Sequence, residues 1–392
     1  MLRTTWAPRW CSRASATSGT NRPGAPDSMT RASGEHRIER LPDIIADLSP
    51  RERATVESIF DIRRDVVSMT VPAPMVPSVE RQFGDLAAVS DQIIVAVTNR
   101  YTLEGTSFNN LRALRPMTRS PSSEIEQSET GRFDPFADPL TQTPDNAIGR
   151  VRGRRCVTAA NLAASDAWHG VIIFDEPDPF VFDSEDVADY LSTGLEWARK
   201  AHSYDVGVVH PFLFWNANAR AGASLPHGHA QVVVRRDAPF SRIEVQRSAS
   251  TRYREINGGA NYFDNLMRSH ASLGLASRVG ESSVVTHLTP IKEREMLVIG
   301  TGLNDEFFRS IGQVLVAFRD SLGVESFNLG VFGQPLGSDE STGWEGFPAV
   351  ARIVDRGRTD VRSSDFAGME LYGQSVVSAD PFEAARMIAK AI

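Results

Sequence analysis

The stretch that decides the fold reads Asn216-Ala217-Asn218-Ala219-Arg220-Ala221-Gly222-Ala223-Ser224-Leu225-Pro226-His227-Gly228-His229-Ala230-Gln231. It follows a predicted strand over 206–215 and leads into another over 231–234. The loop between them is rich in Ala and Gly, which let the main chain approach a ligand closely. His227, His229 and Gln231 alternate along extended chain, so their side chains share one face. Two imidazoles and an amide are therefore expected to converge beside a loop rich in backbone N–H groups.

This arrangement favours chemistry on a phosphate. Backbone N–H groups in such a loop form an anion-binding nest, and Asn216, Ser224 and Gln231 can add neutral hydrogen bonds to phosphate oxygens. An imidazole held by its other nitrogen is a competent nucleophile near neutral pH. A histidine that attacks phosphorus fits better than acyl transfer, because no lysine- or serine-based triad is evident in the loop. The alternatives for His227 and His229 are surface or core histidines, or two metal ligands.

Predicted helices and strands follow each other in the same order twice. A strand, a helix and two more strands are expected over 171–234, and the order returns over 296–354. Ahead of them, residues 41–60 have helical spacing, 71–77 are proline-rich and expected to be extended, and 93–97 form an apolar strand. The sequence therefore predicts an α+β fold with a tandem duplicated repeat, in which a mostly antiparallel sheet packs against helices.

The predicted organisation has three parts. Residues 1–40 are expected to be a disordered tail, 41–245 the first repeat with the active site, and 246–392 a second, degenerate repeat. Within the first repeat, residues 118–147 are poor in apolar side chains and rich in Pro, Ser, Thr and Asp. This composition predicts a flexible surface insertion.

Residues 1–28 are rich in Arg and Ser and have no acid before Asp27, which resembles a transit peptide. The simpler interpretations are a disordered tail, or a chain that starts at Met29. The working prediction is a cytoplasmic location.

Composition excludes several classes of protein. The 392 residues carry a net charge of −7, which argues against a protein whose main partner is nucleic acid. Two cysteines, Cys11 and Cys156, exclude a disulfide framework and any zinc site made of four cysteines. No apolar run approaches 18 residues, so no membrane partner is expected.

The segment 216–231 resembles the active site of galactose-1-phosphate uridylyltransferase and its relatives in the histidine-triad superfamily, which include ADP-sugar and dinucleoside polyphosphate phosphorylases. The likeness extends over roughly residues 60–390. Asn99-Arg100-Tyr101 is similar to the family's Asn-x-aromatic element of the nucleotide pocket. His169-Gly170-Val171-Ile172-Ile173 resembles the strand that precedes the family's loop, and residues 367–371 resemble a late Gly-x-Glu segment. The resemblance implies two histidine-triad-like repeats.

The resemblance also implies a role for each site residue. His229 would be the nucleophile that carries a covalent nucleotidyl group, and His227 and Gln231 would complete the catalytic set. The backbone carbonyl of His227 would fix the tautomer of His229. Four residues of the loop would bind the phosphates: Asn216, Gly222, Ala223 and Ser224. Asn99 and Tyr101, just past the end of a predicted strand, would contact the nucleoside.

The chain departs from the family pattern at its metal site. Family members often bind zinc through C-x-x-C, a further His and the first His of the active-site pair, whereas here only His227 of that set is present. We therefore expect no zinc and no other cofactor. The strand of the second repeat that would match the active site has no histidine over 347–352, which predicts a degenerate repeat.

Three functions remain open from the sequence. The first is transfer of a nucleoside monophosphate from a nucleoside diphosphate sugar to a sugar 1-phosphate. The second is a phosphorylase of nucleoside diphosphate sugars or dinucleoside polyphosphates, with inorganic phosphate as acceptor. The third is a relative that binds nucleotide and catalyses nothing. The expected partners are thus a nucleotide-sugar with a sugar phosphate or phosphate, and homodimerisation is a family-level expectation.

Overall fold

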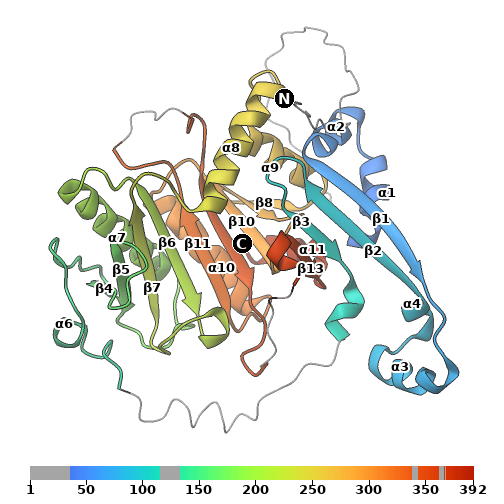
Figure 1. Ribbon diagram of the computed structural model, residues 1–392, viewed down its shortest axis with the longest axis horizontal. Helices are drawn as coiled ribbons and strands as arrows, with labels where there is room; N and C mark the ends of the chain where they lie inside the picture. The colour runs from blue at the N-terminus through green and yellow to red at the C-terminus, as the bar shows by residue number, and fades with distance from the viewer. Residues whose placement is uncertain (1–35, 115–132, 338–342, 362–365, 367) are drawn as a thin grey trace, which may run out of the picture.

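The computed structural model describes residues 36–114, 133–337, 343–361, 366 and 368–392. The predicted α+β class is confirmed: helices pack against one large antiparallel sheet and one smaller sheet (Figure 1). The expected tail over 1–35 and the part of the expected insertion over 118–132 lie outside the described residues.

Nine strands form the large sheet, in the order β4-β5-β7-β6-β11-β12-β10-β9-β8, and every neighbouring pair is antiparallel. The strands are β4 (Cys156–Ala160), β5 (His169–Phe174), β6 (His210–Ala217), β7 (His229–Arg235), β8 (Ala276–Val279), β9 (Ser282–Thr286), β10 (Glu293–Gly300), β11 (Phe327–Phe332) and β12 (Ala349–Asp355). The order 4-5-7-6 in the first half is mirrored by 11-12-10-9 in the second. The two halves meet where β6 pairs with β11, so the predicted duplication appears as two equivalent four-stranded units joined edge to edge.

One long helix in each half covers the same face of this sheet (Figure 1). α7 (Ser184–Tyr204) begins with a capping box from Asp183, and α10 (Asp305–Asp320) is capped by Asn304. The two helices pack together closely at Gly312. A Cβ atom there would lie 2.7 Å from the backbone of Ser184, so only glycine permits this approach. The shared helix layer places both halves over one hydrophobic core.

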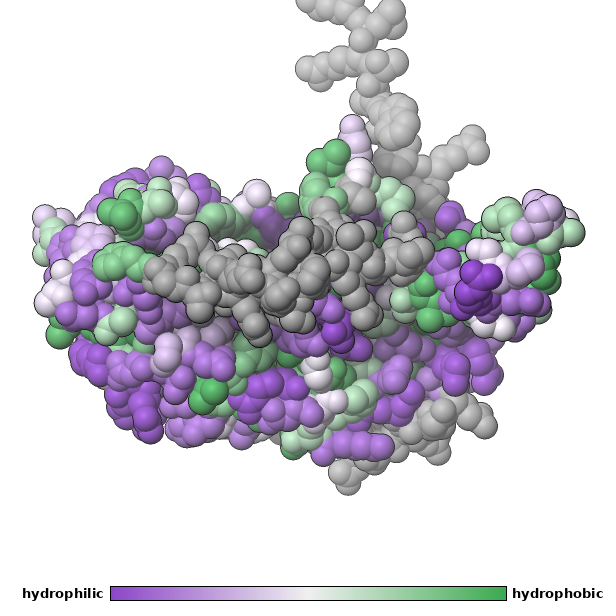
Figure 2. Space-filling model, turned by 90° about the horizontal axis from the view of Figure 1, so that it is seen from below, coloured by the Kyte–Doolittle hydropathy of each residue, from purple (hydrophilic) through white to green (hydrophobic). Residues whose placement is uncertain are grey.

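A second, four-stranded sheet has the order β1-β2-β3-β13. Its strands are β1 (Phe60–Ser68), β2 (Asp91–Asn99), β3 (Gly105–Phe108) and β13 (Gln374–Val377), and β13 runs parallel to β3. The hairpin of β1 and β2 projects to one side, with α3 (Val76–Phe83) and α4 (Leu86–Ser90) at its tip (Figure 1). From below, polar and apolar residues lie side by side on this tip (Figure 2). The other α-helices of the described residues are α1 (Leu41–Ala46), α2 (Pro50–Ile59), α6 (Pro139–Gln142), α8 (Ser241–Ile256), α9 (Tyr262–Ser272) and α11 (Pro381–Ala391).

Three local predictions need correction. The helix expected over 41–60 is two helices, because Ser49 caps a new helix that starts at Pro50. The proline-rich stretch 71–77 is not wholly extended, since α3 begins at Val76 with Pro77 in its first turn, where a missing N–H costs nothing. Residues 36–40 do not belong to a disordered tail: Ile38 is buried in the core, and its N–H donates to Asp380.

The division of the chain at residue 245 stays a prediction, because both halves contribute to one continuous sheet. No helix in the described ranges is long and apolar enough to cross a membrane.

Candidate active site

His229 starts β7 and is held in one tautomer. Its Nδ1 lies 2.7 Å from the backbone carbonyl of His227, and a carbonyl only accepts, so Nδ1 carries the proton. The lone pair is therefore on Nε2. Burial lowers the pKa of His229 below its ordinary value of 6.5, although the bond to the carbonyl acts in the opposite sense. The ring is thus neutral at pH 7, which is the form that can attack phosphorus.

His227 is buried, and both of its ring nitrogens face acceptors. Nδ1 lies 2.8 Å from Oδ2 of Asp134, and Nε2 lies 3.0 Å from the backbone carbonyl of Phe174. Both contacts are hydrogen bonds only if both nitrogens donate, which is the imidazolium form of the ring. The pair with Asp134 then joins opposite charges.

Residues 133–147, the described part of the predicted insertion over 118–147, include a segment around Asp134 that lies at this site. Besides the carboxylate of Asp134, this segment brings the ring of Phe136 edge-on to both histidines, with centroids 5.8 Å from His227 and 5.2 Å from His229. The described part of the insertion therefore covers the site. Neither residue was among the predicted site residues.

Gln231 is oriented by two neighbours, and we call these three residues, Asn161, His169 and Gln231, the Gln231 cluster. The N–H of Ser165 donates to Nδ1 of His169 at 3.0 Å, so Nε2 of that ring carries the proton and donates to Oε1 of Gln231 at 2.8 Å. Asn161 Nδ2 donates to the same oxygen at 3.1 Å. Because Oε1 accepts twice, the amide nitrogen of Gln231 is the end available to donate to an anion. Burial lowers the pKa of His169, which agrees with a neutral ring.

The loop after β6 is braced by the second half of the chain. Asn216 lies opposite Asn328 of β11, and Nδ2 of Asn328 donates to Oδ1 of Asn216 and to the carbonyl of Ala221, at 2.8 Å each. The amide nitrogen of Asn216 is therefore the end that can donate to a ligand. Asn328 was missed in the sequence because its pairing with Asn216 depends on the junction between the repeats.

The expected anion nest at Gly222 and Ala223 is not supported. The N–H of Gly222 donates to the carbonyl of Ala219, and the N–H of Ala223 donates to Asn218, so both are consumed by the turn itself. Gly222 has a φ of 98°, which explains the glycine. Ser224 is exposed beside this turn.

Asn99 and Tyr101 are not brought to this site. Asn99 ends β2 of the small sheet and is fully buried; its amide nitrogen donates to the hydroxyl of Tyr262 at 2.7 Å. Its oxygen accepts the N–H of Tyr101 at 3.0 Å, and the ring of Tyr101 packs edge-on against Tyr253 and Tyr262. Both residues therefore pack between the small sheet and α8–α9, and the structure does not bring them to His229.

The second repeat carries a charged counterpart, the Arg352 cluster, which comprises His287, Glu295 and Arg352. The backbone N–H of Asn161 donates to the carbonyl of His169, and that of His287 donates to the carbonyl of Glu295, at 2.9 Å each. Gln231 pairs across the sheet with the position two residues after His169, and Arg352 pairs with the position two residues after Glu295. By this correspondence Val350 takes the place of His229, so the second repeat has no nucleophile there, as predicted.

A zinc ion does not fit His227, because Nε2 of the ring faces a carbonyl and Nδ1 faces a carboxylate that is already bonded to it. Within the described residues, no group of three or more His, Cys, Asp or Glu side chains could hold a metal. The absence of a cofactor stays a prediction for the chain as a whole.

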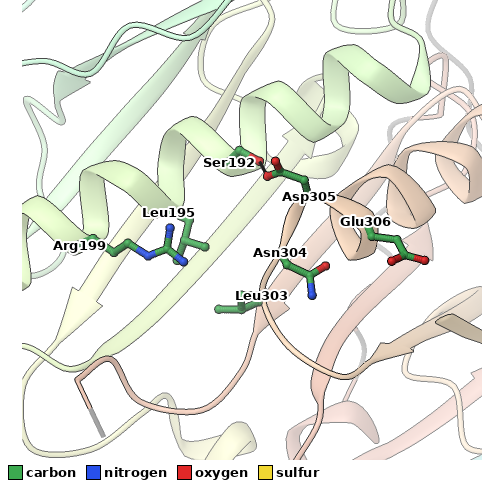
Figure 3. Close-up of a pocket in the computed structure, with 7 residues that line it drawn as sticks. All are labelled: Ser192, Leu195, Arg199, Leu303, Asn304, Asp305 and Glu306. Carbon is green, nitrogen blue, oxygen red and sulfur yellow. Dashed lines mark hydrogen bonds between the residues drawn. The ribbon is translucent and has the colours of Figure 1, made fainter. Parts of the chain in front are cut away.

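A cavity of about 420 Å³ lies elsewhere, between α7 and the start of α10 (Figure 3). Ser192 and Arg199 line it from α7, and Asp305 and Glu306 line it from α10. Ser192 donates to Asp305 at 2.7 Å, so the two helices are bonded across its edge. The cavity shares no lining residue with the histidine loop.

No protein-family model and no curated protein matches the chain. Several solved structures do. The ADP-glucose phosphorylase of Arabidopsis thaliana with bound ADP-glucose is 15% identical with a TM-score of 0.59, over 75% of this chain and 98% of that one. A uridylyltransferase is 15% identical with a TM-score of 0.51, over 76% of this chain and 98% of that one. This chain has the uridylyltransferase fold. A GalT-like protein of Arabidopsis thaliana is 15% identical with a TM-score of 0.53, over 66% and 91%. The predicted resemblance is thereby confirmed as a shared fold.

Proposed function

We propose that this protein is a nucleotidyltransferase that uses His229 as a covalent carrier. Nε2 of His229 attacks the α-phosphorus of a nucleoside diphosphate sugar, an N–P bond forms, and the P–O bond to the sugar 1-phosphate breaks. The observation that carries the proposal is the 2.7 Å bond from Nδ1 of His229 to the carbonyl of His227, which leaves the lone pair on Nε2. An acceptor phosphate then attacks the same phosphorus and regenerates the imidazole.

The neighbouring amides suit the charge that develops at phosphorus. The amide oxygen of Gln231 accepts two hydrogen bonds, and that of Asn216 accepts one from Asn328. Both amide nitrogens are therefore oriented to donate to phosphoryl oxygens. Loss of one such donor typically costs about 10²-fold in rate. The leaving sugar 1-phosphate is a phosphate monoester with a second pKa of about 6, so its departure needs little acid assistance.

The acceptor is either a sugar 1-phosphate or inorganic phosphate. The first would make the protein a hexose-1-phosphate uridylyltransferase in galactose metabolism, with a UDP-sugar as donor. The second would make it a phosphorylase. The fold shared with ADP-glucose phosphorylase is a reason to test inorganic phosphate alongside a sugar 1-phosphate. Incubation of UDP-glucose or ADP-glucose with phosphate or with galactose 1-phosphate, followed by product analysis, separates the two. A cytoplasmic location and a homodimer remain part of the proposal.

Intact-protein mass spectrometry tests the covalent step. After brief exposure to UDP-glucose or ADP-glucose, the wild-type chain should gain one nucleotidyl group, and His229→Gly should gain none. His202→Gln is the matched control, because its ring also bonds a backbone carbonyl, that of Val208, but lies at the end of α7. An unchanged mass with both donors, together with thermal stabilisation by nucleotide, would instead support a protein that binds without catalysis.

A further inference from the structure

We propose that Asp134 is the positioning residue of this active site: it anchors the ring of His227, and through the His227 carbonyl it fixes His229, the task that a metal ion would otherwise perform. The inference deepens the proposed function and rests on it for its kinetic test. Its geometric part can be tested without turnover.

The carbonyl that orients His229 belongs to His227, which is held both at its ring and at the peptide that follows it. The ring of His227 is held between Asp134 and the Phe174 carbonyl, at 2.8 and 3.0 Å. The following peptide is held as well, because Gly228 donates to Pro177 at 2.7 Å and accepts from Phe174 at 3.0 Å. Among these contacts, the one from Asp134 is made by a side chain and the others by backbone groups, so a substitution can remove it without breaking the sheet.

The carboxylate of Asp134 is itself preset. Its Oδ1 accepts the backbone N–H of Phe136 at 2.9 Å, while its Oδ2 faces His227. The same turn places the Phe136 ring against both histidines. One short segment therefore supplies the anion that pairs with His227 and the apolar cover that keeps water from His229.

A carboxylate can replace a metal here because it binds one nitrogen of the ring and leaves the other for the Phe174 carbonyl. The ring is then fixed at two points, as it would be between a metal and a second partner. Charge-assisted hydrogen bonds are about twice as strong as neutral ones, so one side chain suffices for this task.

The kinetic test uses Asp134→Ala and Asp134→Asn, with Asp138→Asn as the matched control. Asp138 belongs to the same segment, and its carboxylate bonds the hydroxyl of Thr141. Rapid-quench mass spectrometry follows nucleotidyl-His229 formation with UDP-glucose or ADP-glucose. We expect Asp134→Ala to slow this step about 10- to 100-fold, the usual loss when a supporting residue is removed. Asp134→Asn should lie between, because its amide oxygen still accepts from Nδ1.

Two further readouts separate positioning from loss of structure. Nucleotide-donor affinity, measured by titration calorimetry, should stay close to wild type in both variants, because both oxygens of Asp134 are engaged, by His227 and by the N–H of Phe136. Wild-type protein should keep its rate after chelation and contain no stoichiometric zinc by elemental analysis. A wild-type rate in Asp134→Ala, or one tightly bound zinc per chain whose removal stops the reaction, would overturn the proposal.

The geometric test does not need an active enzyme. In protein labelled with ¹⁵N-histidine, the Asp134–His227 bond should give a downfield N–H proton resonance that disappears in Asp134→Ala and remains in Asp138→Asn. If no donor labels the wild-type chain, the proposed function fails, and this resonance alone decides whether Asp134 anchors His227. A resonance that survives in Asp134→Ala contradicts the anchor even if the enzyme is active.

Discussion

Arg352 should be among the residues on which stability depends most. Its side chain is largely buried, and its two terminal nitrogens donate to both oxygens of Glu104, at 2.8 and 3.2 Å. Its Nε lies 3.1 Å from Oε1 of Glu295, an ion-pair contact outside hydrogen-bond geometry. Burial alone would raise the pKa of Glu104, but Arg352 overrides it and holds that pKa well below its usual range. For Glu295, burial dominates and raises the pKa.

Arg352→Met removes the cation and leaves the Glu104 carboxylate buried. Two neighbours of Glu104 remain: Arg242, 3.0 Å away on a side chain that is half exposed, and Nε2 of His287 at 3.7 Å. Breaking a buried ion pair from one side typically costs about 3–5 kcal/mol, whereas replacing both partners by apolar residues of similar volume is often neutral. We therefore expect a loss of about 3–5 kcal/mol in Arg352→Met, most of which is restored in Arg352→Met/Glu104→Met.

Urea unfolding followed by tryptophan fluorescence and by circular dichroism measures this loss, provided that the two transitions coincide. Arg63→Met is the matched control, because Arg63 forms an exposed pair with Asp65 at 2.8 Å, and such pairs contribute about 0.2–1 kcal/mol. A loss below 1 kcal/mol in Arg352→Met, or a double variant no more stable than the single one, would refute the electrostatic argument.

Two other predictions concern buried histidines. The Nδ1 of His270 bonds the Leu266 carbonyl at 2.8 Å and its Nε2 accepts the N–H of Leu288 at 3.2 Å, while burial lowers its pKa from 6.5 to about 3. The folded state therefore binds fewer protons than the unfolded state between these pH values. The free energy of unfolding should keep its full value above pH 6.5 and fall on acidification toward pH 3, by up to about 1.4 kcal/mol per pH unit. Thermal melts at a series of pH values should show a shallower dependence on pH in His270→Gln. His169→Phe removes one donor to Gln231 and should lower kcat about tenfold with little change in KM, since a hydrogen bond is worth about 1 kcal/mol; an unchanged kcat would mean that Asn161 alone orients the amide.

The histidine loop was predictable because its decisive pattern is local. His229 and Gln231 alternate within one strand, and a strand presents alternate residues to one face whatever it pairs with. The bond from His229 to the carbonyl of His227 was implied by the family resemblance, and it is equally local because it spans two residues. The duplicated order of elements was also predictable, because both halves have the same order of strands and helix along the sequence.

Long-range contacts were not predictable in the same way. Asp134 reaches His227 across 93 residues, and the composition of its segment has no feature that distinguishes an active-site cover from a surface loop. The placement of Asn99 away from the histidine site was not predictable for a related reason. Asn99 is the last residue of β2 and Asn161 directly follows β4, and each accepts the backbone N–H of the residue two further on, at 3.0 and 2.9 Å. Their local signatures are the same, and only the sheet to which each strand belongs separates them.

The two clusters explain why a duplicated fold would need only one reactive site. In the Gln231 cluster, neutral donors bond the oxygen of the amide and leave its nitrogen for an anion. In the Arg352 cluster the two terminal nitrogens of the guanidinium donate to Glu104, and its Nε lies 3.1 Å from Glu295. An anion entering there would have to displace a buried carboxylate, which is costly. Each chain should therefore take up a single nucleotidyl group, and a second covalent group in the mass spectrum of the wild-type chain would contradict this division of labour.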